Sequence, residues 1–269
     1  MPPSLLRLLT YQRAWRNSMF GRVIAYLYGL ACYLIFLVSF LYSIAFVGNL
    51  VVSKSVDTGL SVPLTEALII DILLLSLFAI QHSVMARQWF KRAWTKIVPK
   101  PVERSTYVLL ASLVLLLLFW QWRPITAVIW DVQNPLGRIF LQALFWIGWG
   151  QVFISTALVD HLGLFGLRQV HRYLKRQPEE APPFKTPGLY KVVRHPLYLG
   201  FIIAFWSTPH MTLGHLFFAA VCTAYILVAI QFEERDLLSY YGDTYRQYRK
   251  EVSMIFPWRR PRKAANSSQ

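Results

Sequence analysis

The sequence predicts an all-α polytopic membrane protein with about five to six transmembrane helices. Its 269 residues are 55% hydrophobic and their mean hydropathy is +0.40, a composition that is too apolar for a soluble globular domain. Long apolar stretches carry this excess, and short segments rich in Lys and Arg separate them. The expected spans are roughly residues 23–50, 64–85, 105–122, 139–159, 197–212 and 214–232.

The net charge of +15 is distributed as a topology signal. Of the 28 Lys and Arg residues, 25 lie in the N-terminal arm, in the second and fourth connecting segments and after the last span. The other face has only Lys54, Arg123 and Arg138. Since cytosolic segments carry the positive charge, both termini are expected in the cytosol. Nucleic-acid binding is not expected, whereas contact with anionic lipid fits the same charge.

The first four spans differ in what they contain. The first is uninterrupted and reads as a plain anchor, and the third is rich in Leu. The second carries Asp71, expected to pair with a hydroxyl or amide, and His82 near its inner end. The fourth contains Gly148 and Gly150, small residues that permit close helix approach. Both cysteines lie inside apolar runs, so we expect inert thiols and no metal site.

The C-terminal part begins with an amphipathic segment after Asp160, followed by a proline-rich loop. The fifth and sixth spans should form a helical hairpin, and a polar helix should start at Glu233 and Glu234. We therefore expect a basic cytosolic arm (1–22), four transmembrane helices (23–160), a C-terminal region (161–257) and a disordered tail (258–269).

The C-terminal region gathers polar side chains at one membrane face. Its centre is the stretch 194–200, Arg-His-Pro-Leu-Tyr-Leu-Gly, and the carboxylate pair follows the next span. Charge placed against lipid is costly and usually functional. Tyrosine rings attract sulfonium or ammonium groups, and carboxylates bind amino and hydroxyl groups. The alternative is a set of ordinary interfacial residues, since Arg and His snorkel and Tyr belongs to aromatic belts.

These residues carry a family resemblance. Residues 188–190, 194–200, 233–234 and 241–245 resemble the C-terminal signature of the isoprenylcysteine carboxyl methyltransferases, integral-membrane enzymes that use S-adenosylmethionine. The resemblance covers about residues 177–257. It implies a cytosolic cofactor pocket built from the C-terminal hairpin and its flanking loops. The implied cofactor contacts are Gln177, Pro182, Pro183, Phe184, Lys185, Tyr190, Arg194, His195, Pro196, Leu197, Tyr198 and one of Glu233 and Glu234.

The upstream part is similar to one branch in particular. Residues 81–87, 101–107 and 160–169 resemble the bacterial methanethiol S-methyltransferases, which convert methanethiol to dimethyl sulfide. This branch implies a bacterial inner-membrane protein. The isoprenylcysteine enzymes have an arginine one turn before the equivalent carboxylate, but here that turn reads Ala229-Ile230. An uncharged small thiol needs no such partner, unlike a prenylcysteine carboxylate.

Transfer to a thiol requires a proton acceptor, since a free cysteine thiol titrates only near about 8.5. A neutral histidine can take that proton. The candidates are His161, ranked first because it follows Asp160 beside the cofactor loop, and His82; Tyr190 or Tyr198 would orient the base. For each histidine, an ordinary interfacial role remains the alternative.

Two other functions stay open at this point. One keeps the fold and cofactor but methylates an isoprenylcysteine carboxylate, a phospholipid amine or another small thiol. The other is a non-catalytic protein that uses its intramembrane histidines for haem binding or transport. Binding of S-adenosylhomocysteine separates the methyltransferases from the second class. The expected partners are a small apolar thiol and membrane lipid.

Overall fold

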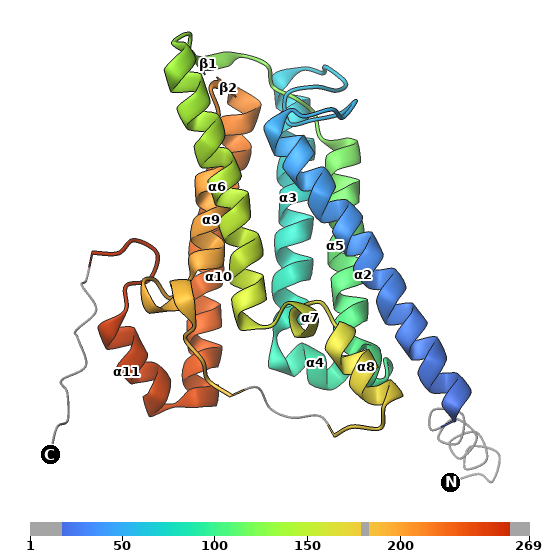
Figure 1. Ribbon diagram of the computed structural model, residues 1–269. Helices are drawn as coiled ribbons and strands as arrows, with labels where there is room; N and C mark the ends of the chain where they lie inside the picture. Colours follow the sequence, from blue (N-terminus) through green and yellow to red (C-terminus); the bar gives the residue numbers. More distant parts are fainter. Residues whose placement is uncertain (1–17, 179–182, 259–269) are drawn as a thin grey trace, which may run out of the picture. The chain divides into compact units, whose positions relative to one another are not determined.

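The computed structural model describes residues 18–178 and 183–258 (Figure 1). Five of the helices in these ranges are long and apolar enough to cross a membrane, which confirms the predicted class. They are α2 (Met19–Gly48), α3 (Leu64–Ala86), α5 (Lys100–Gln121), α6 (Pro135–Val159) and α10 (Leu213–Tyr241). The shorter helices are α4 (Gln88–Trp94), α7 (His161–Leu164), α8 (Leu167–Leu174), η1 (Gly188–Lys191), α9 (Pro196–Trp206) and α11 (Asp243–Glu251).

The predicted fifth span is too long. Helix α9 has 11 residues, a length of about 16 Å, whereas a bilayer core is about 30 Å thick. It ends at Trp206 because residues 210–212 form a strand, β2 (His210–Thr212), that pairs antiparallel with β1 (Val128–Asp131). This small sheet was not expected in an all-α fold. Composition did not reveal it because short strands between apolar helices leave little alternation to detect.

The chain divides into two compact units, and each is described by itself. Unit 1 comprises the described residues within 1–43, 76–118 and 161–182, and unit 2 comprises those within 44–75, 119–160 and 183–269. The predicted division into consecutive segments stays a prediction. Most of the basic arm and of the tail lies outside the described residues.

Unit 1 fastens the amphipathic segment to two helices. A core of Met85, Tyr107 and Val108 lies near Phe165, whose ring stacks on Phe36 with centroids 3.8 Å apart. The expected amphipathic helix is α8, whose Val170 is fully buried. These contacts bring the segment after α6 against α2 and α5.

Unit 2 has an aromatic core and one tight helix crossing. Trp122 is fully buried, and its indole N–H donates to the carbonyl of Val56 at 3.0 Å. In Figure 1, α6, α9 and α10 run side by side. A Cβ added to Gly148 would lie 2.7 Å from the carbonyl oxygen of Gly200, so the α6–α9 crossing requires glycine there. Gly150 faces open space, so its predicted role in close packing is wrong.

The last long helix is longer than expected. Helix α10 continues through Glu233 and Glu234 to Tyr241, and α11 starts only after Gly242, whose φ is 55°. The expectation that the carboxylate pair begins a new helix is therefore wrong. The side chains of the pair instead project from the last turns of a membrane-spanning helix.

Asp71 behaves as expected in the same unit. Its Oδ1 accepts a hydrogen bond from the backbone N–H of Arg123 at 2.9 Å. The carboxylate thus meets a backbone donor where α5 has ended, and we assign it a structural role.

Candidate functional site

The stretch 194–200 is held in place by backbone pairing before it becomes a helix. The N–H groups of Arg194 and His195 donate to the carbonyls of Ser253 and Met254, at 2.8 and 3.1 Å. Pro196 then occupies the first turn of α9, where its missing N–H costs nothing. This order explains the proline between the histidine and Tyr198. The proline starts the helix, and His195 lies just ahead of it as the N-cap residue.

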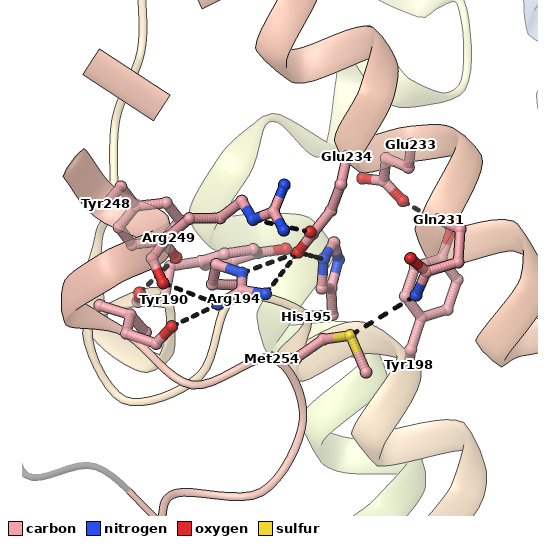
Figure 2. A network of polar contacts seen from close by, with 11 residues as sticks. Tyr190, Arg194, His195, Tyr198, Gln231, Glu233, Glu234, Tyr248, Arg249 and Met254 are labelled. Atoms are coloured by element: carbon pink, nitrogen blue, oxygen red, sulfur yellow. Dashed lines mark hydrogen bonds and ion pairs between the residues drawn. The ribbon is translucent and has the colours of Figure 1, made fainter. Parts of the chain in front are cut away.

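Glu234 is the centre of a buried ionic network (Figure 2). Arg194 donates to its Oε1 from Nε and Nη2, both at 2.7 Å, and His195 Nε2 lies 3.2 Å from the same oxygen. Arg249 contacts the other oxygen at 3.3 Å. The side chains of Arg194 and Glu234 are only 9% and 6% exposed. A buried carboxylate needs such partners, and both oxygens of Glu234 have them. We therefore assign Glu234 a structural role.

Glu233 is in a different situation, although it is the next residue. Its side chain is partly exposed, and its Oε2 accepts one hydrogen bond, from the Tyr198 hydroxyl at 2.8 Å (Figure 2). Within the described residues its Oε1 accepts none. Of the two carboxylates, Glu233 is the one that has an oxygen left for a ligand.

A group of tyrosines surrounds the two carboxylates. The Tyr190 hydroxyl donates to the Ser155 carbonyl at 3.5 Å, and the Tyr248 hydroxyl donates to the Tyr190 carbonyl at 2.6 Å. Burial, and secondarily the charge of Glu233, raises the pKa of Tyr190. Burial also raises the pKa of Tyr245 and Tyr248. These phenols therefore stay protonated and act as donors, so Tyr190 is unsuited to be a base.

Tyr245 has an unpaired donor. Its side chain is 1% exposed, and its hydroxyl has no hydrogen-bond partner within the described part of the chain. Phe184 packs beside it, with ring centroids 6.0 Å apart. A buried hydroxyl without a partner costs about 1–3 kcal/mol. Such groups usually have a water or a ligand as the partner.

His161 lies in unit 1, at the start of α7, and its partner comes from α2. The Tyr33 hydroxyl is 2.8 Å from His161 Nε2, and the ring of Phe165 meets the imidazole edge to face. Burial lowers the pKa of His161 below its usual 6.5. The imidazole is therefore neutral at pH 7, as a proton acceptor must be. Tyr33 also gives α2 a role beyond that of a plain anchor.

His82 also lies in unit 1 and is paired with a tyrosine. The Tyr107 hydroxyl on α5 is 3.0 Å from His82 Nε2, and Phe78 stacks on the imidazole. The Arg104 guanidinium lies 4.9 Å from the centre of the Tyr107 ring. Both predicted histidines thus have a phenol partner. Their expected proximity to the signature residues of unit 2 stays a prediction.

The remaining predicted residues are less informative. Gln177 is exposed in unit 1, Pro183 and Lys185 are exposed in unit 2, and Leu197 is partly buried. Pro196 is buried, and its carbonyl accepts from Gln151 Nε2 at 2.8 Å. Pro182 lies outside the described residues.

The sequence reasoning missed Arg249, which completes the Glu234 network. The sequence could have indicated it, because Tyr248 and Arg249 lie three and four residues after Tyr245 on α11 and so share a face of the helix with it. The reasoning also missed Tyr33 and Tyr107, whose only signal is a hydroxyl within an apolar span.

Known proteins that are similar to this chain identify its family. A family model described as "Protein of unknown function (DUF1295)" matches residues 90–252. The methanethiol S-methyltransferase of Mycobacterium tuberculosis is 56% identical over 88% of this chain and 97% of its own. Methanethiol S-methyltransferase 1 of Bradyrhizobium diazoefficiens is 58% identical over 91% and 86%. The chain belongs to the methanethiol S-methyltransferase family.

Membership of this family supports a methyltransferase activity. The match extends to the methanethiol S-methyltransferase of Crocosphaera subtropica, 49% identical over 92% of this chain and 97% of its own. A more distant relative, nurim of Mus musculus, is 28% identical over 62% of this chain and 66% of its own. No solved structure matches the chain.

Proposed function

We propose that this protein is an integral-membrane S-adenosylmethionine-dependent methyltransferase that converts methanethiol to dimethyl sulfide. The observation that carries the proposal is the family membership together with the unpaired oxygen of Glu233 beside Tyr198. The expected setting is a bacterial inner membrane. The distribution of Lys and Arg supports a cytosolic position for both termini.

The residues present fit this cofactor. When bound, it supplies an electrophilic methyl group on a sulfonium. Glu233 has an acceptor oxygen for an amino or hydroxyl group, and Tyr245 has an unpaired donor hydroxyl. The faces of Tyr190 and Tyr198 suit a cation, an effect of about 0.5–2 kcal/mol. Tyr198 holds the Glu233 carboxylate, while Arg194 and His195 hold the loop through Glu234.

Proton removal falls to a neutral histidine. His161 is our first candidate because burial keeps its pKa low and Tyr33 orients its ring. His82, paired with Tyr107, is the second. The histidine would take the thiol proton and leave the sulfur as a thiolate, the form of the thiol that is nucleophilic toward a methyl group. The imidazolium then returns the proton to water.

The acceptor preference rests on α10. One turn before the carboxylates, Ile230 is fully buried and Ala229 is uncharged. That stretch has no cation for a prenylcysteine carboxylate, which favours a small apolar thiol.

Two measurements test the proposal. Purified protein in lipid nanodiscs should form dimethyl sulfide from methanethiol and S-adenosylmethionine, detected by gas chromatography. Binding of S-adenosylhomocysteine, followed by calorimetry, should weaken about 10- to 100-fold in Glu233→Gln, since a charge-assisted hydrogen bond contributes about 1.5–3 kcal/mol. Glu66→Gln, the same substitution at an exposed position in the first turn of α3, is the control and should bind as wild type.

The outcomes are separable. Turnover of isoprenylcysteine but not of methanethiol would refute the substrate and leave the cofactor intact. Absence of S-adenosylhomocysteine binding in wild type would refute the methyltransferase itself. A Soret band in the purified protein would instead indicate haem.

A further inference from the structure

Beside the Glu234 network lies a cavity of about 630 Å³ with an unusual lining. Four cationic side chains contribute to it: Arg194, Arg246, Arg249 and Lys250. Its other lining residues are Leu238, Ser253, Met254 and Trp258, so none of the described lining residues is acidic. Single-sign lining of this kind concentrates ions of the opposite charge.

The cations come from one helix face and one loop. Arg246, Arg249 and Lys250 are spaced three and four residues apart on α11, which places them side by side. Arg246 is bonded to Asp243 but its side chain is 65% exposed, and Arg249 contacts Glu234 while 45% exposed. Each guanidinium therefore has further N–H donors for an anion.

The length of α10 is sufficient for its C-terminal end to reach the lipid headgroups. Leu238, which lines the cavity, is 25 residues after the start of α10, a rise of about 37 Å. The hydrocarbon core is about 30 Å thick and the whole bilayer about 40–45 Å. If α10 enters at one edge of the core, Leu238 lies several ångströms beyond the other edge, where phosphates are found.

Exposed aromatic side chains border the cations. Trp258, which lines the cavity, is 82% exposed, and Phe256, whose ring centroid lies 5.6 Å from that of Trp258, is 50% exposed. Trp and Tyr concentrate at the membrane–water interface, because their rings are apolar and their N–H or O–H is polar. Such a border suits acyl chains, whereas a free anion in water gains nothing from it.

We propose that this cavity binds the phosphate headgroup of an anionic glycerophospholipid. The cations contact the phosphate, and the aromatic residues contact the lipid beside it. The sulfonium cofactor proposed above is a poor occupant, because the four cationic lining side chains outnumber the two carboxylates, Glu234 and Asp243, that pair with them. The inference does not depend on the proposed function.

The test uses the full chain in a neutral detergent. Binding of dioctanoyl phosphatidylglycerol, measured by calorimetry, should be at least tenfold tighter than that of dioctanoyl phosphatidylcholine. The double variant R246Q/K250Q should bind phosphatidylglycerol about 30-fold more weakly, since each Lys or Arg near an anionic surface contributes about a fivefold factor. The matched control R92Q/K96Q removes the same charge from exposed positions that do not line the cavity, and should change binding less than twofold.

Wild type alone provides a second measurement. Raising NaCl from 50 to 500 mM should weaken phosphatidylglycerol binding at least tenfold and phosphatidylcholine binding less than twofold. Equal affinity for the two lipids, or equal losses in the two double variants, would overturn the proposal. Displacement of the lipid by glycerol phosphate at equal concentration would also overturn it, because the site would then recognise a free phosphate.

Discussion

Replacing Glu234 by Gln should destabilise the protein because it removes the charge that neutralises a buried guanidinium. Arg194 is 9% exposed and directs Nε and Nη2 to Glu234 Oε1, both at 2.7 Å. Removing one partner of a buried pair costs about 3–5 kcal/mol. We expect a loss of about 3 kcal/mol, the low end of this range. The amide oxygen of the new glutamine still accepts a hydrogen bond, and Arg194 Nη1 also donates to the backbone carbonyls of Arg249 and Val252.

Thermal unfolding in detergent measures this loss. For a chain of about this size, 1 kcal/mol corresponds to about 2–4 °C in Tm, so Glu234→Gln should lower Tm by about 6–12 °C. The matched control is Glu233→Gln at the adjacent position. Its carboxylate makes one hydrogen bond, to Tyr198, so the expected loss is about 1 kcal/mol or less. The same variant should nevertheless weaken S-adenosylhomocysteine binding.

Glu234 is thus expected to stabilise the fold, and its neighbour Glu233 is expected to bind the ligand. This expectation is refuted if both variants lower Tm equally, or if Glu234→Gln melts as wild type. A Glu233→Gln protein that binds S-adenosylhomocysteine normally would refute the second half alone.

Four further outcomes are expected. Gly148→Ala should lower the unfolding free energy by about 1–3 kcal/mol, because its Cβ would meet backbone atoms at 2.7 Å. Tyr245→Phe should raise Tm in the absence of ligand and weaken S-adenosylhomocysteine binding, since it removes an unpaired buried hydroxyl. Tyr33→Phe should lower kcat for dimethyl sulfide formation about tenfold with little change in cofactor affinity, because it removes the hydroxyl that orients the His161 imidazole. The acid limb of kcat/KM should have its midpoint below pH 6.5, since burial lowers the pKa of His161 and keeps its base form at lower pH.

Matched variants check these outcomes. Gly150→Ala faces open space and should gain up to about 1 kcal/mol of helix propensity, the opposite sign to Gly148. Tyr28 lies on the same helix as Tyr33, and its hydroxyl is hydrogen-bonded to Thr106. Tyr28→Phe removes that hydrogen bond and should leave kcat unchanged. The lowered pKa of His161 also makes the stability of the protein depend on pH. The unfolded chain binds a proton near pH 6.5 before the folded chain does, so stability from His161 falls as pH drops through 6.5. An acid limb above pH 6.5, or one unchanged in Tyr33→Phe, contradicts the role of His161.

The helical membrane fold followed from the sequence with little ambiguity. A span must keep about 20 apolar residues together, so hydropathy locates α2, α3, α5, α6 and α10 directly. The stretch 194–200 and the carboxylate pair were equally visible, because polar groups in an apolar chain stand out. The partner of Asp71 was predicted by type, as an amide or a hydroxyl.

Only the tertiary structure separated residues that look alike in the chain. Glu233 and Glu234 have the same side chain, yet Glu233 contacts Tyr198 and Glu234 contacts Arg194. Gly148 and Gly150 are equally small, but one faces Gly200 and the other faces open space. A helix rotates by about 100° per residue. Neighbours in sequence therefore meet different surroundings, and their roles depend on contacts between elements that no local pattern encodes.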